Sequence, residues 1–347
     1  MGIVEVSGQT YHMNDNLIKK WNDVKEGKLK KTDSDRVYIT DGRERSGKSL
    51  FTIQQSAFID EEVLEDQKDG KILPKIEMGN ATSWEVNSKW RREATKRYKE
   101  GSLLPQITFN SKETLKAIRI FKSTEKKTKV INFDEAFRGM SSKGVLSKEN
   151  KRLVQALMEM GQSNLVVFIV SPSFFLLEFY PAVLRSNALF HIKKDKKSNK
   201  RVVRIFNYKK KASLYQIGIR KGWGYNLKTK QNANFYNIYP GGKDFEWRYR
   251  LKKQLSLQDV DVKEEKEEHK WKRERDLMIK ALYKDIPSLR KLSSKLKEWG
   301  IDISHMQLSF ILKKKDDEYE EDFKDKKIDI EETEDEEDLE INKEIEE

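Results

Sequence analysis

The residues whose types and spacing could carry chemistry form two groups, and the first is a glycine-rich loop. The chain contains Gly42-x-x-x-x-Gly47-Lys48-Ser49, which follows a β-favouring run at 37–40 and precedes a helix-like run from Leu50. A loop between a strand and a helix is the context in which this pattern binds phosphate. The glycines allow a tight turn whose N–H groups face phosphate oxygens, and the helix N-terminus favours the anion.

Each position of this loop has an expected role. Lys48 is expected to reach the β- and γ-phosphates of a nucleoside triphosphate, and the Ser49 hydroxyl to ligate Mg²⁺. The alternative is a structural turn that matches the pattern by chance, which the flanking strand and helix disfavour. The predicted nucleotide-binding segment comprises Gly42, Arg43, Glu44, Arg45, Ser46, Gly47, Lys48, Ser49 and Leu50.

The second group is a pair of acids at the end of an apolar strand. Lys129–Phe133 runs directly into Asp134 and Glu135, which matches the Walker B pattern. Asp134 would hold the Mg²⁺ that Ser49 coordinates, and Glu135 would orient and polarise the attacking water. An isolated acidic pair after a strand is commonly a simple turn, but the upstream loop favours the catalytic interpretation. We therefore predict ATP and Mg²⁺ as cofactors.

Three further residues are candidates for the same site. Ser171 follows the apolar run Leu165–Val170, and ligands of open α/β sheets bind beyond the carboxyl ends of the strands. Ser171 is therefore either a γ-phosphate sensor or an ordinary turn serine. Arg138 and Arg185 are candidates for a catalytic arginine that stabilises the transition state, acting within the chain or across a subunit boundary. Each could equally be a surface or DNA-contacting residue.

The elements that must position these residues alternate along the chain. Alternating strands and helices imply a mostly parallel sheet covered on both faces, so the predicted class is α/β. The last two strands bracket a basic segment at 193–201 that reads as an exposed hairpin or a pair of edge strands. The predicted strands are 37–40, 106–109, 129–133, 165–170, 188–192 and 202–206, and the helices between them are 50–58, 84–98, 110–121 and 147–160.

Together these residues resemble P-loop ATPases that carry an extra strand and a catalytic glutamate. Within that group the chain is similar to the FtsK–HerA branch and to zonula-occludens-toxin-type phage or mobile-element ATPases. The matching stretch is roughly 35–207, and it rests on the glycine loop, on the segment 134–139 and on the segment 168–174. The resemblance implies an oligomeric, ATP-driven machine that acts on DNA. Ser171 is a departure, because those motors commonly carry glutamine there.

A second chemistry-bearing region lies near the carboxyl end. Leu289, Leu292 and Leu296 share one helical face, Gly300 ends that helix, and Ser304 with Gln307 forms a capping box for the next. Two short helices joined by a tight turn predict a helix-turn-helix, whose second helix would enter the major groove. The alternative is a helical hairpin that packs on its own chain or on another subunit. The predicted DNA contacts are Arg290, His305, Gln307, Ser309, Lys313 and Lys314.

Charge and composition narrow the function classes. Residues 316–347 carry nineteen acidic side chains and four lysines, which give a net charge of −15. Because the whole chain has a net charge of +12, residues 1–315 carry +27. A basic body favours a polyanionic partner such as DNA, and the alternative is solubility with a disordered tail. The chain has no cysteine, which excludes disulfides and thiolate zinc sites. No run is apolar enough to span a membrane, and we expect a cytoplasmic protein, in the host cytoplasm if virus-encoded.

The leading expectation is an ATP-hydrolysing motor that moves, packages or transfers viral or mobile-element DNA. It would be a homo-oligomer, with a viral or mobile-element protein as a further partner. The alternative is a non-motor, ATP-dependent DNA-binding switch in replication, partition or regulation; a small-molecule kinase would leave the basic body unexplained. The expected domains are a leader (1–34), a P-loop ATPase domain (35–207), a basic aromatic extension (208–252), a helical connector (253–284), a helix-turn-helix module (285–315) and an acidic disordered tail (316–347).

Overall fold

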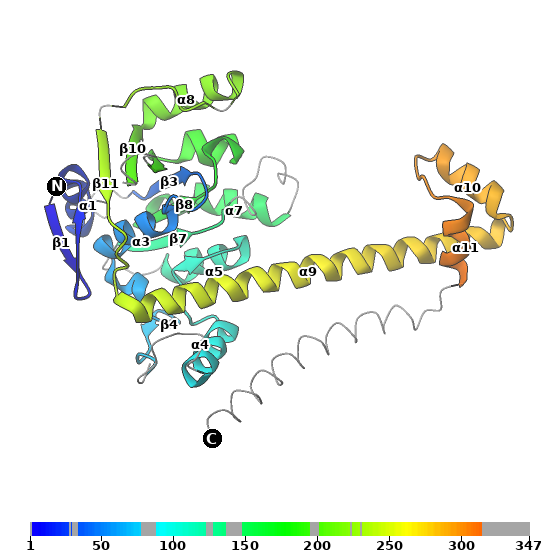
Figure 1. Cartoon of the computed structure of the whole chain (residues 1–347), viewed down its shortest axis with the longest axis horizontal. Helices are drawn as coiled ribbons and strands as arrows, with labels where there is room; N and C mark the ends of the chain where they lie inside the picture. The colour runs from blue at the N-terminus through cyan, green and yellow to red at the C-terminus, as the bar shows by residue number, and fades with distance from the viewer. Residues whose placement is uncertain are drawn as a thin grey trace. The chain divides into compact units, whose positions relative to one another are not determined.

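The computed structural model describes most of the chain and divides it into two compact units (Figure 1). The first unit is formed by residues 1–258 and the second by residues 259–347. Arg138, Lys314 and the acidic segment 316–347 lie outside the described residues. Those described are 2–27, 29, 34–77, 88–122, 128–136, 148–194, 201–222, 224–229 and 231–313.

A seven-stranded sheet organises the first unit. Its order is β11-β10-β9-β3-β8-β7-β6, in which β9, β3, β8, β7 and β6 run parallel and β10 and β11 continue the sheet antiparallel. The prediction of a mostly parallel sheet is confirmed. The strands are β3 (Arg36–Gly42), β6 (Ile107–Thr108), β7 (Lys129–Phe133), β8 (Leu165–Val170), β9 (Ala188–Lys194), β10 (Arg201–Asn207) and β11 (Gln231–Phe235).

The strand order matters for the site. Strand β8 follows β7 in the chain but lies between β7 and β3, with Val167 opposite both Ile131 and Val37. An additional strand therefore separates the strand that leads into the glycine loop from the strand that ends in the acidic pair. Every residue of β7 and β8 is buried, which explains why both read as continuous apolar runs rather than alternating ones.

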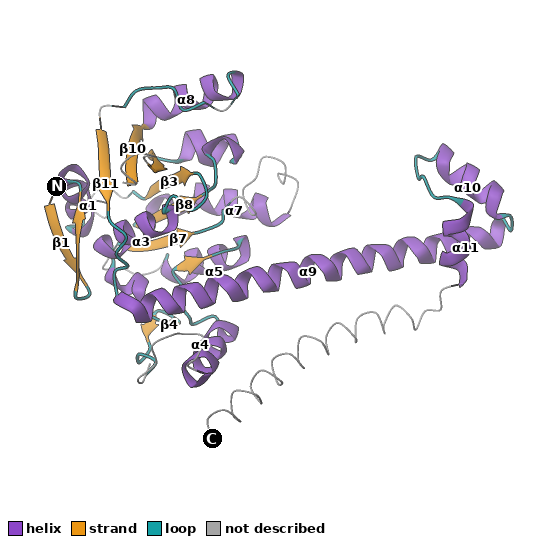
Figure 2. Cartoon of the chain, viewed as in Figure 1, coloured by secondary structure: helices purple, strands orange, loops and turns teal. Residues whose placement is uncertain are grey.

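Helices cover both faces of this sheet (Figure 2). Tyr38 and Phe168 point into the core on one face, and Ile39 and Val167 point into the core on the other. The first face is covered by α1 (Asp15–Lys25), α3 (Lys48–Ile59), α4 (Ser88–Glu100) and the first turns of α9 (Gly242–Asp285). The second face is covered by α5 (Ser111–Phe121), α7 (Lys148–Glu159) and α8 (Tyr208–Arg220).

The predicted leader forms part of the main core. A hairpin of β1 (Gly2–Val6) and β2 (Gln9–Met13) precedes α1, and both strands bury alternate side chains. Trp21 of α1 is fully buried, and its indole N–H donates to the Gln55 amide oxygen of α3 at 2.8 Å. Residues before the glycine loop thus help to hold the helix that follows it.

The region 208–252, expected as a basic aromatic extension, consists largely of regular structure. It holds α8, β11 and the first turns of α9, which begins at Gly242 rather than at the predicted connector. The shorter elements of the first unit are β4 (Gln67–Lys68), β5 (Lys71–Ile72), the 3₁₀ turns at Glu61–Leu64, Met160–Gln162 and Phe174–Leu176, and a π-helix at Tyr180–Arg185.

The second unit is a small helical core. The last turns of α9 pack with α10 (Leu289–Glu298) and α11 (His305–Lys313) around Ile279 and Leu308. The predicted capping box is confirmed: the Ser304 N–H donates to the Gln307 amide oxygen at 2.9 Å, and the Gln307 N–H donates to the Ser304 hydroxyl at 3.2 Å.

Candidate functional site

The glycine loop has a backbone that its two glycines require. Gly42 has φ of 146°, and a Cβ there would lie 2.4 Å from the Ile192 carbonyl oxygen of β9. Gly47 has φ of 93° and caps the start of α3. The loop therefore turns tightly from β3 into α3, and the N-terminus of α3 opens at the carboxyl edge of the sheet.

The loop is closed around its own lysine. The Lys48 ammonium donates to the carbonyl oxygens of Gly42 and Arg43, each at 3.0 Å. Burial lowers the pKa of Lys48, while Glu135 and Asp134 act in the opposite direction. The buried Ser46 hydroxyl has no hydrogen-bond partner among the described residues. That hydroxyl can donate to an anion, and the Lys48 ammonium inside the loop supplies a positive charge, so the loop fits a phosphate group.

Two oxygens that suit a magnesium ion lie beside this loop. The Ser49 hydroxyl donates to Asp134 Oδ1 at 3.1 Å, although the two residues are 85 positions apart. Mg²⁺ commonly takes one or two carboxylates and completes its shell with water and substrate phosphates. Within the described ranges no three His, Cys, Asp or Glu residues form a metal cluster. Ser49 and Asp134 therefore fit a Mg²⁺ that is shared with a nucleotide.

Glu135 follows in an uncommon backbone conformation. Its φ is 56°, and its N–H donates to Asp134 Oδ1 at 3.1 Å. The side chain is 39% exposed and faces the cavity that holds Lys48 and Ser49. The turn after β7 thus separates the two acids by role: Asp134 is buried beside Ser49, and Glu135 points into accessible space.

Helix α9 contributes two side chains that the sequence analysis did not assign. The Tyr249 hydroxyl donates to Asp134 Oδ2 at 2.5 Å, and the Lys253 ammonium donates to Glu135 Oε1 at 2.7 Å. Burial, and then the negative charge of Asp134, raise the pKa of Tyr249 well above its usual range, so the phenol stays a donor. For Lys253, burial lowers the pKa but Asp134 and Glu135 outweigh it, and the net shift is upward.

One cavity of about 570 Å³ at the carboxyl edge of the sheet is lined by Lys48, Ser49, Asp134, Glu135, Tyr249 and Lys253. The volume lies in the range of ordinary ligand pockets. The sequence-predicted residues at its wall are Glu44, Arg45, Gly47, Lys48, Ser49, Leu50, Asp134, Glu135 and Ser171. The residues that sequence reasoning missed are Arg201, Asn237, Tyr239, Tyr249 and Lys253.

The remaining candidates lie as follows. Ser171 directly follows β8 at the cavity, and its hydroxyl donates to the Ser173 carbonyl at 3.0 Å. Arg185 is not brought to the glycine loop: it forms an ion pair with Asp35, which precedes β3, and donates to the Leu157 carbonyl at 2.6 Å. Because Asp35 lies at the amino end of β3, Arg185 sits at the opposite edge of the sheet from the cavity. Arg138 lies outside the described residues.

Asp41 anchors the start of the loop. Its fully buried carboxylate accepts the Phe174 N–H at 2.9 Å and the Tyr225 hydroxyl, and lies 2.9 Å from His191 Nδ1. The Tyr225 ring stacks on His191 at 3.7 Å. Tyr225 therefore covers the end of the sheet and holds the residue before Gly42 in place.

Five of the six predicted DNA contacts lie on helices of the second unit, and Lys314 lies outside the described residues. Arg290, His305, Gln307 and Lys313 are exposed, and Ser309 is partly buried. The Gln307 amide oxygen is engaged in the capping box. The exposed surface of α11 also carries Met306 and Phe310, which are 62% and 76% exposed, so it is mixed in polarity rather than uniformly basic.

The structure thus brings the glycine loop between β3 and α3 next to the acidic pair that follows β7, with β8 between the two strands. The chain has the P-loop NTPase fold with an additional strand between β3 and β7. No helix within the described ranges is both long and apolar enough to cross a membrane.

No protein-family model and no curated protein matches the chain. Among solved structures, the N-terminal domain of zonular occludens toxin from Neisseria meningitidis aligns at 15% identity and TM-score 0.27, covering 50% of this chain and 84% of that one. A KaiC-like protein from Pyrococcus horikoshii OT3 aligns at 15% identity and a TM-score of 0.29, and the alignment covers 60% of this chain and 88% of that one. The genome-packaging NTPase B204 of Sulfolobus turreted icosahedral virus 2 aligns at 13% identity and a TM-score of 0.27, and the alignment covers 58% of this chain and 91% of that one. At these identities and TM-scores, function has to be argued from the chain's own residues.

Proposed function

We propose that the chain binds ATP with Mg²⁺ and hydrolyses it. The observation that carries this proposal is the 3.1 Å contact between the Ser49 hydroxyl and Asp134 Oδ1, made in one cavity with Lys48 and Glu135. These groups come from two strands that are not adjacent in the sheet, and a structural turn would not require them to meet.

Each residue has a role in this proposal. The N–H groups of the loop 42–49 and the Lys48 ammonium bind the phosphates, and Ser49 and Asp134 hold Mg²⁺. The bound ion neutralises charge on the β- and γ-phosphate oxygens. Glu135 orients a water molecule for attack on the terminal phosphorus and accepts its proton. Ser171, at the end of the intervening strand, senses the terminal phosphate.

We propose further that hydrolysis drives an action on DNA, in a homo-oligomer encoded by a virus or a mobile element. The net charge of +27 on residues 1–315 supports a polyanionic partner. The exposed cations Arg290 and Lys313 on the paired helices of the second unit support the same partner.

The test is ATP turnover of the purified chain, measured alone and with duplex or single-stranded DNA. We expect Lys48→Ala to abolish hydrolysis, because the ammonium at the centre of the loop is lost. Glu135→Gln should bind ATP and fail to cleave it, since an amide cannot accept the proton. Unchanged turnover in Lys48→Ala would refute the assignment of the loop.

The same assay separates a motor from a switch. Turnover that DNA stimulates, together with an oligomer in solution, supports the motor. Slow turnover that is indifferent to DNA, with nucleotide-dependent DNA affinity, supports the switch. The strand form that stimulates more identifies the substrate.

A further inference from the structure

The cation Lys253 has an unexplained place in the cavity. Its ammonium lies 2.7 Å from Glu135 Oε1 and 3.8 Å from Asp134 Oδ2. It therefore stands beside both acids at the wall that Lys48 and Ser49 also line. The sequence offered Arg138 and Arg185 for the cation that stabilises the transition state, and Arg185 lies at the far edge of the sheet.

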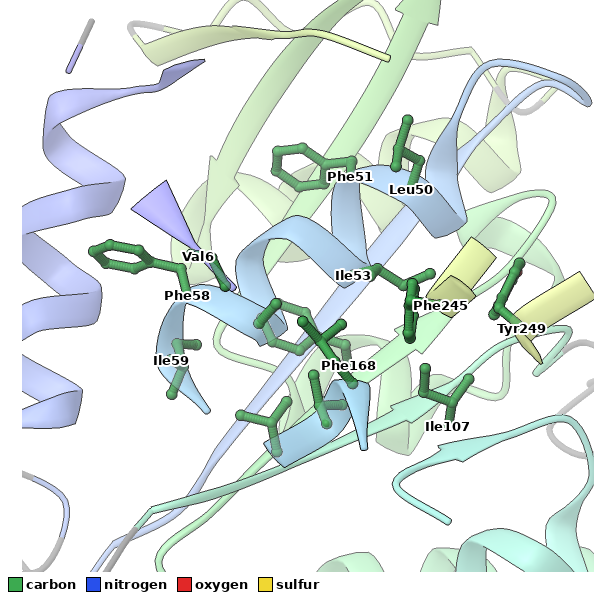
Figure 3. Close-up of a cluster of buried hydrophobic side chains, with 14 of the residues drawn as sticks. Val6, Leu50, Phe51, Ile53, Phe58, Ile59, Ile107, Phe168, Phe245 and Tyr249 are labelled. Atoms are coloured by element: carbon green, nitrogen blue, oxygen red, sulfur yellow. The ribbon is translucent and has the colours of Figure 1, made fainter. Parts of the chain in front are cut away.

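The position of Lys253 is set by the first turns of α9, which hydrogen bonds and buried side chains attach to the first unit. Arg248 donates to Asp66 at 3.0 Å, and Lys252 donates to the carbonyl oxygens of Leu104 and Ile107 at 3.0 and 2.6 Å. Phe245 and Tyr249 are buried in the core (Figure 3). Lys253 lies one helical turn after Tyr249, so the same face of α9 delivers both side chains to the acids.

The ion pair with Glu135 is accessible to solvent and to a ligand in the cavity. The Lys253 and Glu135 side chains are 29% and 39% exposed, so water screens this pair more than it would a fully buried one. A triphosphate entering the cavity brings more negative charge than one carboxylate does. Movement of the ammonium away from Glu135 frees Oε1 to accept a hydrogen bond from the attacking water.

We propose that Lys253 is the catalytic cation of this site: on ATP binding it moves from Glu135 to the terminal phosphate and stabilises the charge that develops there. This inference rests on the proposed ATP hydrolysis. It assigns within the chain a role that the sequence left open between two arginines and a neighbouring subunit.

The step balances as follows. The water oxygen forms a bond to the terminal phosphorus while the bond from that phosphorus to the β,γ-bridging oxygen breaks, which yields ADP and inorganic phosphate. Glu135 takes the proton of the water. Lys253 transfers no proton and contributes only charge and hydrogen bonds to the phosphoryl oxygens, the type of stabilisation that dominates phosphoryl transfer.

The experiment compares Lys253→Met, Lys253→Arg and the full-length wild-type chain. We expect Lys253→Met to lower kcat about 100-fold or more, the cost of losing one preorganised donor. Its affinity for a non-hydrolysable ATP analogue should fall several-fold while its affinity for ADP stays unchanged, because ADP lacks the terminal phosphate. Lys253→Arg keeps the charge and should recover a large part of the rate.

Two controls make the result decisive. Arg250→Met removes an exposed cation that pairs with Glu246 on the outside of α9, and it should hydrolyse ATP at the wild-type rate. Retained ADP binding shows that Lys253→Met is folded. Hydrolysis by Lys253→Met at or above the wild-type rate would overturn the inference, since Lys253 would then only restrain Glu135. If the wild-type chain itself fails to hydrolyse ATP, the proposed function fails and this inference fails with it.

Discussion

Asp134 is held between two hydroxyl groups that come from different helices. The Ser49 hydroxyl of α3 contacts Oδ1, and the Tyr249 hydroxyl of α9 contacts Oδ2. Loss of a group that orients a metal ligand commonly lowers metal affinity or activity roughly 10- to 100-fold. In the proposed Mg²⁺ site, Tyr249 would therefore set which oxygen of Asp134 faces the ion.

Tyr249→Phe tests this role. The variant keeps the buried ring and removes only the hydroxyl, so the fold should persist while the Asp134 carboxylate becomes free to rotate. We expect the Mg²⁺ concentration for half-maximal ATP turnover to rise about tenfold, with a smaller change in kcat at saturating Mg²⁺. A Mg²⁺ titration of turnover gives both values.

Tyr236→Phe is the matched control, because Tyr236 is 52% exposed and lies outside the cavity wall. Its Mg²⁺ dependence should equal that of the wild-type chain. If Tyr249→Phe also shows the wild-type Mg²⁺ dependence, the hydroxyl contributes packing and not orientation.

At the residue scale, the sequence predicts the parts of the site that are local in the chain. The loop 42–49 and the pair Asp134 and Glu135 each form a contiguous pattern whose chemistry can be read directly. Tyr249 lies 115 positions from Asp134, and Lys253 lies 118 positions from Glu135. Their one-turn spacing is common on any helix, so no signal in the sequence distinguishes them before α9 is placed.

At the element scale, a buried lysine holds a π-helix in place. Lys211 of α8 is fully buried, and its ammonium donates to the Ala182 and Val183 carbonyls at 3.0 and 2.7 Å. It also donates to the carbonyl and hydroxyl oxygens of Ser186, each at 2.6 Å. The last carbonyls of a helix need partners, and here one side chain supplies them.

Lys211→Met should therefore destabilise the first unit. Methionine fills the same volume but leaves several buried carbonyls without donors, which costs about 3 kcal/mol in the free energy of unfolding. Urea denaturation followed by circular dichroism measures this loss. Lys209→Met, on the exposed side of the same helix, should change the unfolding free energy by less than about 0.5 kcal/mol. Equal stability of the two variants would show that the carbonyls find water instead.

The same lysine explains why α8 was not predicted. Its buried face consists of Lys211, Leu214, Tyr215 and Gly218, so two of four core positions carry residues that do not read as apolar. Gly218 is needed because a Cβ there would lie 2.2 Å from the Phe175 ring. Strands β7 and β8 present the opposite case: they are buried on both faces, and their predicted bounds agree with the structure.

At the scale of the whole molecule, charge is divided unevenly among the segments. Residues 1–258 carry a net charge of +23, residues 259–315 carry +4, and residues 316–347 carry −15. Affinity for DNA that arises from charge alone should therefore follow the first unit and fall steeply with salt. A contribution of the paired helices has to be measured at nearly constant charge.

Two shortened chains make this comparison. A chain of residues 1–315 lacks only the acidic segment and carries +27, whereas a chain of residues 1–258 carries +23 and keeps Tyr249 and Lys253. We expect equal basal ATP turnover, because the whole cavity lies in the first unit. We expect the shorter chain to bind duplex DNA at least about tenfold more weakly at the same salt, since it lacks the helices that would enter the major groove.

The charge difference between the two chains is small, so a large difference in affinity belongs to α10 and α11 themselves. Equal affinity would contradict the helix-turn-helix assignment and leave DNA binding to the basic first unit. The exposed apolar side chains Met306 and Phe310 would then favour a protein partner for α11. Adjacent exposed apolar side chains are typical of protein-binding surfaces, whereas contact with DNA phosphates requires polar or basic ones. Arg290→Ala and Lys313→Ala in the 1–315 chain refine the result: loss of phosphate contacts should weaken binding to all sequences and reduce its salt dependence.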